Sequence, residues 1–100
     1  MAKKLWSIFT KDMNCCILTG CYGVERHHVF GNSKKRKALC EQYGYIAPLV
    51  PTLHPNGANC TWSDNIKRID TMLKETCQKD FEEKHGTRKE FIELFGMGYL

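Results

Sequence analysis

The sequence predicts a single α+β domain over residues 1–100, with two short strands in the first half, then a long helix and a short terminal helix. A chain of this length can bury one hydrophobic core but not two. Short apolar stretches bounded by Gly, Asn and Pro precede residue 51, whereas apolar residues recur every three or four positions after residue 61. No stretch approaches the roughly 20 apolar residues of a membrane span, so no membrane association is expected.

The two strands are expected at 24–30 and 45–50. The first contains aromatic and β-branched residues and is followed by the turn signal Gly31-Asn32-Ser33. The second is stopped by Pro51, which cannot donate to a strand ladder. Between them, residues 34–42 could form one or two helical turns that end at Gly44.

The long helix is predicted to begin at a capping box, Thr61-Trp62-Ser63-Asp64, in which Thr61 accepts from backbone N–H groups and Asp64 reaches back. Gly86 is expected to cap its C-terminus. One apolar stripe follows the helix, formed by Ile66, Ile69, Leu73, Cys77 and Phe81.

A second capping box, Thr87-Arg88-Lys89-Glu90, predicts the start of a short helix that ends at Gly96. Its apolar residues are expected in the core, and they are Phe91, Ile92, Leu94 and Phe95.

The charge distribution and the N-terminal sequence indicate which partners and which compartment to expect. Residues 1–37 carry eight Lys or Arg against two acids, and residues 38–100 carry seven against nine. A basic front half favours a polyanionic partner such as DNA, although a solvated basic surface gives the same count. The basic N-terminus lacks the apolar segment of a signal peptide, so a cytoplasmic location is expected.

Six cysteines include no Cys-x-x-Cys pair, so no structural zinc is expected. A disulfide framework would need an oxidising compartment. We therefore expect free thiols that are mostly buried and act as small hydrophobic groups.

The adjacent histidines His27 and His28 are the main candidates for chemistry. Phosphodiester hydrolysis needs a base that takes a proton from water and a cation that stabilises charge on the phosphate, and imidazole suits both tasks. Neighbouring residues in a regular strand point to opposite faces, so the pair shares a site only if the strand ends or bends there. Otherwise one histidine faces solvent and the other packs.

Two further histidines lie outside this pair. His54 follows the second strand, where it could reach back to the first strand or remain an exposed turn residue. His85 lies near the end of the long helix and is expected to cap its last carbonyl groups.

Lys34, Lys35, Arg36 and Lys37 directly follow the first strand's turn. They could contact DNA phosphates, and such contacts would make binding sensitive to salt. A solvated loop is the alternative.

Three stretches carry a resemblance to a known family: SIFTKDMNCCILTG (7–20), VERHHVFGNSKKRKALCEQYGYIAPLVPTLHPNGAN (24–59) and DFEEKHGTRKEFIELFGMGYL (80–100). Together they resemble the small phage-type HNH (His-Me finger) endonuclease-like proteins. The resemblance implies a small ββα-metal (His-Me finger) core with a long C-terminal helix and a short terminal helix, forming a single HNH-like domain.

The resemblance also implies roles for individual residues. His27 would be a metal ligand, His28 the general base, and His54 would orient the base or support the phosphate. Where the family offers a second metal-ligand histidine, this chain has Asn59, or Cys60 or Thr61 if the alignment shifts. The cofactor would be a divalent cation, Mg²⁺ or Mn²⁺.

Two hypotheses of different classes follow. In the first, the chain is a metal-dependent DNA endonuclease or nickase. In the second, it is a catalytically weak or inactive protein that keeps the HNH fold and binds DNA or a protein partner.

Overall fold

A computed structural model describes residues 5–100 as a small compact α+β fold with a two-stranded antiparallel sheet and three α-helices. The sheet and the long and short C-terminal helices confirm the predicted fold class at this level, while residues 1–4 of the predicted domain lie outside the described residues. The elements in chain order are β1 (Glu25–His28), α1 (Lys34–Tyr43), β2 (Ile46–Leu49), a 3₁₀ helix η1 (Pro51–Leu53), α2 (Asp64–Lys84) and α3 (Arg88–Phe95).

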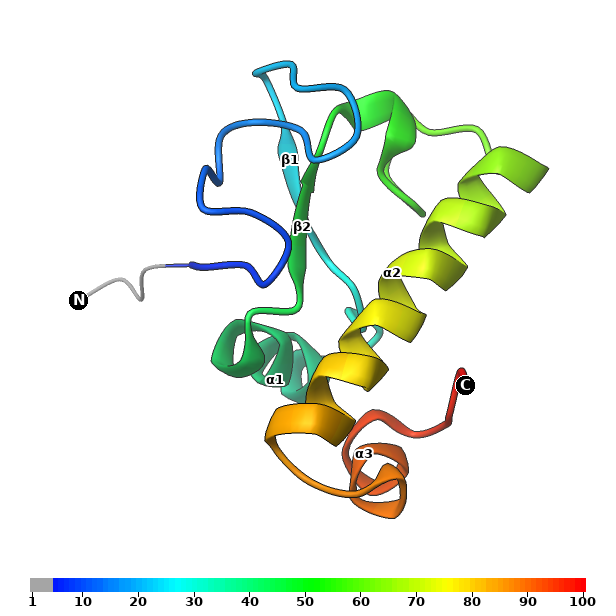
Figure 1. Cartoon of the computed structure of the whole chain (residues 1–100). Coiled ribbons are helices and arrows are strands. Elements are labelled where there is room, and N and C mark those ends of the chain that lie inside the picture. Colours follow the sequence, from blue (N-terminus) through cyan, green and yellow to red (C-terminus); the bar gives the residue numbers. More distant parts are fainter. Residues whose placement is uncertain (1–4) are drawn as a thin grey trace.

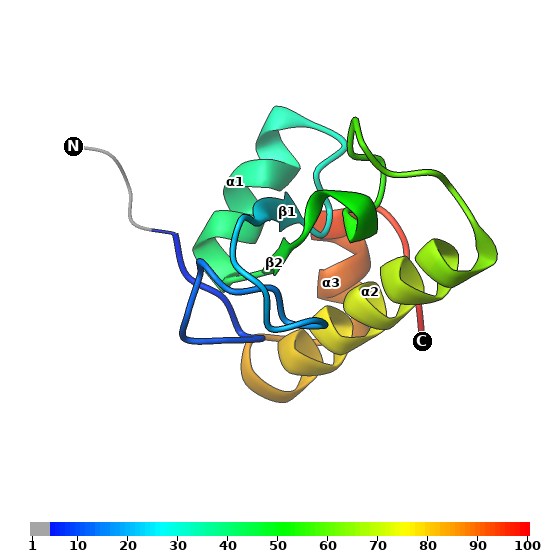
Figure 2. The same ribbon diagram turned by 90° about the horizontal axis from the view of Figure 1, so that it is seen from above.

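The connection between the two strands differs from the prediction. Strands β1 and β2 pair antiparallel with Glu25 opposite Leu49 and His28 opposite Ile46. Their connection contains all ten residues of α1 rather than one or two helical turns. Figures 1 and 2 show α1 and α2 on different sides of the strand pair. A histidine on β1 can therefore face either helix.

Helix α1 has well-defined ends. The Ser33 side chain accepts from the backbone N–H of Arg36 at 3.2 Å, which begins the helix. Gly44 ends it in the left-handed conformation with φ of 78°. A Cβ at Gly44 would lie 2.7 Å from the Trp6 ring, so both the backbone conformation and the packing require glycine.

The predicted start of α2 is wrong by two residues. Ser63 is the N-cap, and its side chain accepts from the Ile66 N–H at 3.3 Å, one of the first N–H groups of the helix, which lack a partner within it. At the other end the cap is His85, and Gly86 follows it, donating to the Phe81 carbonyl.

The capping box of α3 is confirmed. Thr87 accepts from the Glu90 N–H at 3.1 Å, and the Glu90 carboxylate accepts from the Thr87 N–H at 3.0 Å. Phe91 and Phe95 are buried as predicted, whereas Ile92 is exposed because it lies on the outer side of this two-turn helix.

Aromatic side chains dominate the core at the end where α1, α2 and α3 meet. Phe30, two residues beyond β1, packs against a ring of α3 and against the ring of the residue before β2, with centroids 4.6 Å from Phe95 and 6.1 Å from Tyr45. Tyr45 is fully buried and donates to Asp80 of α2 at 3.1 Å. These contacts fix the end of β1 against α2 and α3.

All six cysteines are free thiols, as expected. Only three of them are buried, Cys16, Cys40 and Cys77, so the expectation that most are buried holds for half of the set. Within residues 5–100, no helix is both long enough and apolar enough to cross a membrane.

Candidate active site

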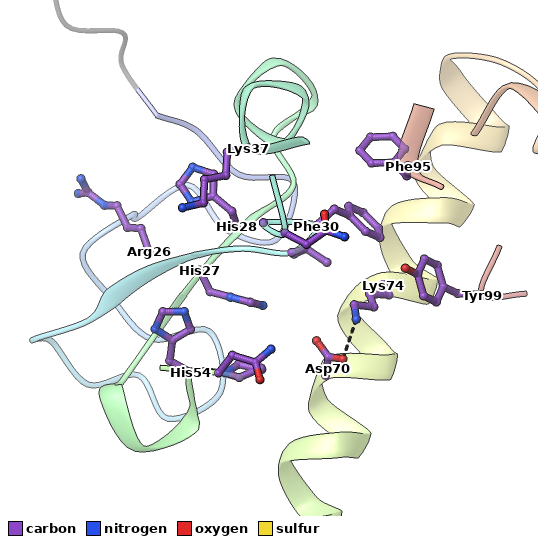
Figure 3. Close-up of a pocket in the computed structure, with 15 residues that line it drawn as sticks. Arg26, His27, His28, Phe30, Lys37, His54, Asp70, Lys74, Phe95 and Tyr99 are labelled. Atoms are coloured by element: carbon purple, nitrogen blue, oxygen red, sulfur yellow. Dashed lines mark hydrogen bonds and ion pairs between the residues drawn. The ribbon is translucent and has the colours of Figure 1, made fainter. Parts of the chain in front are cut away.

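A cavity of about 560 Å³ opens at the end of β1, between the turn that follows η1 and helix α2 (Figure 3). Its walls combine three of the four histidines of the chain with basic, acidic, amide and aromatic side chains. The residues that carry polar chemistry there are Arg26, His27, His28, Asn32, Lys37, His54, Asn56, Asp70, Lys74 and Tyr99.

His27 is the most unusual of these residues. Only 7% of the residue is exposed to solvent. Its Nε2 atom is buried and has no hydrogen-bond partner among the described residues. The pKa of His27 is lowered from 6.5 to about 3, mainly by burial and in smaller part by repulsion from His54, His28 and Lys74. The ring is therefore neutral at physiological pH, and a buried polar atom without a partner needs an explanation.

This depressed pKa predicts a pH dependence of folding stability in the presence of EDTA. The unfolded chain binds more protons at His27 than the folded protein between pH 6.5 and about 3. Stability should therefore fall as the pH drops through this window, by up to about 1.4 kcal/mol per pH unit from this one group. Urea unfolding of wild type and His27→Leu at pH 7, 6 and 5 measures the difference, and equal slopes for the two proteins would contradict the assignment.

His54 lies beside His27, with ring centroids 4.8 Å apart. Its Nδ1 atom is 2.6 Å from the Glu25 carboxylate, which comes from the same side of β1 as His27. A neutral imidazole must donate to a carboxylate, so this contact places the proton on Nδ1 and leaves the lone pair on Nε2. The arrangement matches the carboxylate–histidine pairs that orient metal-binding imidazoles.

His28 faces the other way, as the alternation of a regular strand requires. Its Nε2 atom is 3.2 Å from the Glu41 carboxylate of α1. Because β1 ends at His28, both adjacent histidines still line the cavity, one on each side of the strand end. The fourth histidine, His85, lies elsewhere, with its ring 4.8 Å from that of Tyr43 and its Nε2 3.6 Å from Asp80.

The role predicted for His85 is only partly seen. Its backbone N–H donates to the Phe81 carbonyl and caps α2, while its side chain packs on Tyr43 instead of binding the last carbonyl groups. The nearby Asp80 carboxylate and aromatic ring offer the imidazole better partners than exposed carbonyl groups.

Asn59 does not belong to the cavity. It is exposed in the loop before α2, and the residues of this loop that line the cavity are Pro55 and Asn56, the latter with φ of 62°. Cys60 and Thr61, the other candidates for this position, do not line it either. Pro55 and Asn56 line the cavity and Asn59 does not, so the chain has left the cavity before Asn59 is reached.

Helix α2 contributes two residues that the sequence analysis missed, Asp70 and Lys74. Their side chains form an ion pair of 2.8 Å and face His27 across the cavity (Figure 3). The sequence indicated this pair only through its i, i+4 spacing, which places the two residues one helical turn apart. Each of them directly follows an apolar residue of α2, Ile69 or Leu73. That spacing also occurs in many exposed ion pairs, so it did not stand out.

The four predicted DNA-binding residues form the first turn of α1. Lys37 lines the cavity, and Lys34 and Lys35 are exposed beside it. Arg36 is half-buried and lies against the end of α3, where a Cβ at Gly96 would be 2.5 Å from its guanidinium. Three of the four cations are therefore exposed to solvent, and one of them lines the cavity.

Comparison of the chain with protein-family models, with curated proteins and with solved structures finds no match. Among residues 5–100, no three His, Cys, Asp or Glu side chains are gathered closely enough to hold a metal ion on their own. The cavity thus offers the neighbouring imidazole rings of His27 and His54, and the carboxylate of Asp70, which is paired with Lys74.

Proposed function

We propose that this chain is a metal-dependent DNA endonuclease or nickase of the HNH (His-Me finger) type, acting in the cytoplasm. The observation that carries the proposal is the buried Nε2 atom of His27, which has no partner in residues 5–100 and lies beside His54 in a cavity that His28 also lines. A protein that used this histidine only for packing would gain stability by replacing it with an apolar residue.

The donor set can hold a divalent cation that keeps part of its water shell. His27 and His54 offer imidazole Nε2 atoms, and Glu25 holds the second ring in place. Mg²⁺ commonly binds through few protein ligands, together with waters and substrate phosphates. When bound, such a cation neutralises the developing charge on the phosphate and on the leaving oxygen.

His28 supplies the general base. The Glu41 carboxylate accepts from Nε2 of the neutral ring, which leaves the Nδ1 lone pair free to take a proton from water. The same carboxylate stabilises the imidazolium that this transfer creates. Glu41 is therefore a positioning residue for the base.

Supercoiled plasmid tests the proposal. Wild type incubated with Mg²⁺ or Mn²⁺ should convert it to open-circular or linear DNA, and EDTA should stop the conversion. His28→Ala should lose this activity. Cleavage that continues in EDTA, or none with either metal, would contradict the proposed enzyme.

DNA binding is expected to involve the first turn of α1. Replacing Lys34, Lys35 and Lys37 by Ala should weaken binding and flatten its salt dependence, with a slope reduced by about 0.9 for each lost phosphate contact on duplex DNA. Fluorescence anisotropy with labelled duplex at several salt concentrations measures both quantities.

The matched control removes the same charge from the two C-terminal helices, with Lys67, Lys79 and Lys89 replaced by Ala. These three residues are exposed and do not line the cavity. Equal losses of affinity in the two triple variants would contradict a specific role for the first turn of α1.

A catalytically weak or inactive DNA- or protein-binding protein is the second candidate. The lack of a preformed three-ligand group among the described residues favours it, as does the position of Asn59 outside the cavity. Salt-dependent DNA binding without cleavage under either metal would support this alternative.

A further inference from the structure

The ion pair between Lys74 and Asp70 occupies the wall of the cavity opposite His27. The Lys74 Nζ atom is 2.8 Å from the Asp70 carboxylate, and the two side chains are only 25% and 14% exposed. A carboxylate this far removed from water requires a positive partner. In the structure that partner is an ammonium group that belongs to the chain itself.

Lys74 has a second favourable contact in the same cavity. Its Nζ atom lies 5.4 Å from the centroid of the Tyr99 ring, within the range of a cation–π interaction. The flexible four-carbon stem of lysine allows the ammonium to leave Asp70 while it remains near the ring.

We propose that Lys74 is the resident counter-ion of the cavity and that a divalent cation bound by His27 and His54 displaces it from Asp70, which becomes the third protein ligand. This inference rests on the proposed metal-dependent function and adds to it a competition between Lys74 and the cation for Asp70. A lysine ammonium and a divalent cation compete for one carboxylate, because their like charges repel and each weakens the binding of the other. Lys74 therefore sets the affinity for the cation.

The proposal accounts for two features of the cavity together. His27 presents a buried atom without a partner in the described residues, and no three potential ligands are gathered there. Both features are expected if Asp70 stays paired with Lys74 until the cation binds.

Calorimetric titration with Mn²⁺, without DNA, tests the competition. Lys74→Met keeps the length of the side chain and removes its charge, and it should bind Mn²⁺ at least about tenfold more tightly than wild type. Lys74→Gln should change the affinity in the same direction. The double variant Lys74→Met/Asp70→Asn should show no gain over Asp70→Asn alone, because the proposed third ligand has gone.

The chain offers a closely matched control in Lys84→Met. Lys84 pairs with Asp80 at 3.0 Å on the same helix and with the same i, i+4 spacing, but neither residue lines the cavity. This variant should bind Mn²⁺ as wild type does. Mn²⁺ affinity that is unchanged or weaker in both folded Lys74 variants, checked by circular dichroism, would overturn the inference.

The outcome separates this inference from the proposed enzyme. Tighter Mn²⁺ binding by Lys74→Met, with no plasmid cleavage by wild type, would support the competition and contradict the endonuclease. Plasmid cleavage with unchanged Mn²⁺ affinity in the Lys74 variants would support the endonuclease and contradict the competition.

Discussion

Replacing His28 by Ala should lower the rate of phosphodiester cleavage by about 10²–10⁴-fold, the usual contribution of a positioned general base. The stability of the fold should change little, because His28 is half-buried at the end of β1 and its ring contacts the half-buried carboxylate of Glu41. Single-turnover cleavage of a labelled duplex, with Mn²⁺ at saturation, measures the rate. Added imidazole should restore part of the activity to this variant, since the vacated space can admit a free base.

Glu41→Gln separates positioning from packing. An amide keeps the size of the side chain but removes the charge that stabilises the imidazolium of His28. The cleavage rate should fall, while the circular dichroism spectrum and the urea unfolding midpoint should stay those of wild type. A cleavage rate equal to that of wild type would contradict a positioning role for Glu41, and a lower rate with a lower unfolding midpoint would indicate that Glu41 acts only through packing.

Replacing His27 by Leu is expected to remove cation binding and cleavage while making the protein more stable in EDTA at neutral pH. The buried Nε2 atom has no hydrogen-bond partner within residues 5–100, and an unsatisfied buried polar group costs about 1–3 kcal/mol. Leucine has a similar volume and no polar atom to desolvate. Urea unfolding in EDTA measures the gain, and Mn²⁺ titration measures the loss of binding.

The control for this variant is His85→Leu, in which a histidine outside the cavity is replaced in the same way. It should retain Mn²⁺ binding and cleavage. If His27→Leu is instead strongly destabilised and still binds Mn²⁺ as wild type does, His27 is a packing residue and the donor set proposed for the cavity is wrong.

The parts of the fold that depend on local sequence could be predicted. The capping box at Thr87 and Glu90, the helix end at Gly44 and the apolar stripe of α2 all follow from spacing and backbone preference. The predicted start of α2, at Thr61, was wrong, because a second residue with a hydroxyl group, Ser63, lies close enough to cap the same helix. Only the geometry of the loop before the helix decides between them.

The candidate site could be predicted only in part, since it is assembled by tertiary contacts. His27, His28 and His54 were found because histidine is rare in this chain and these three flank the strands. Their partners were not found. Glu25 and Glu41 lie 29 and 13 positions from the histidines they contact, and nothing in the local sequence indicates these distances.

The position of Asn59 outside the cavity could not be predicted for the same reason. Counting residues from His54 assumes a regular path into α2, but Asn56 adopts a left-handed conformation and the chain leaves the cavity before Asn59. The cavity is therefore completed by Asn56 and by Asp70, which lies farther along α2. A carboxylate in the middle of a helix cannot be assigned to a site until the packing of that helix is known.

The proposed function depends on a divalent cation binding between His27 and His54. The chain has four histidines, so long-range ¹H–¹⁵N spectra of histidine-labelled protein contain four ring systems, which single substitutions assign. Because broadening by Mn²⁺ falls steeply with distance, trace Mn²⁺ should remove the signals of His27 and His54 first and that of His85 last, and excess Mg²⁺ should restore them. Equal broadening of all four rings, or none, would contradict a cation site in this cavity.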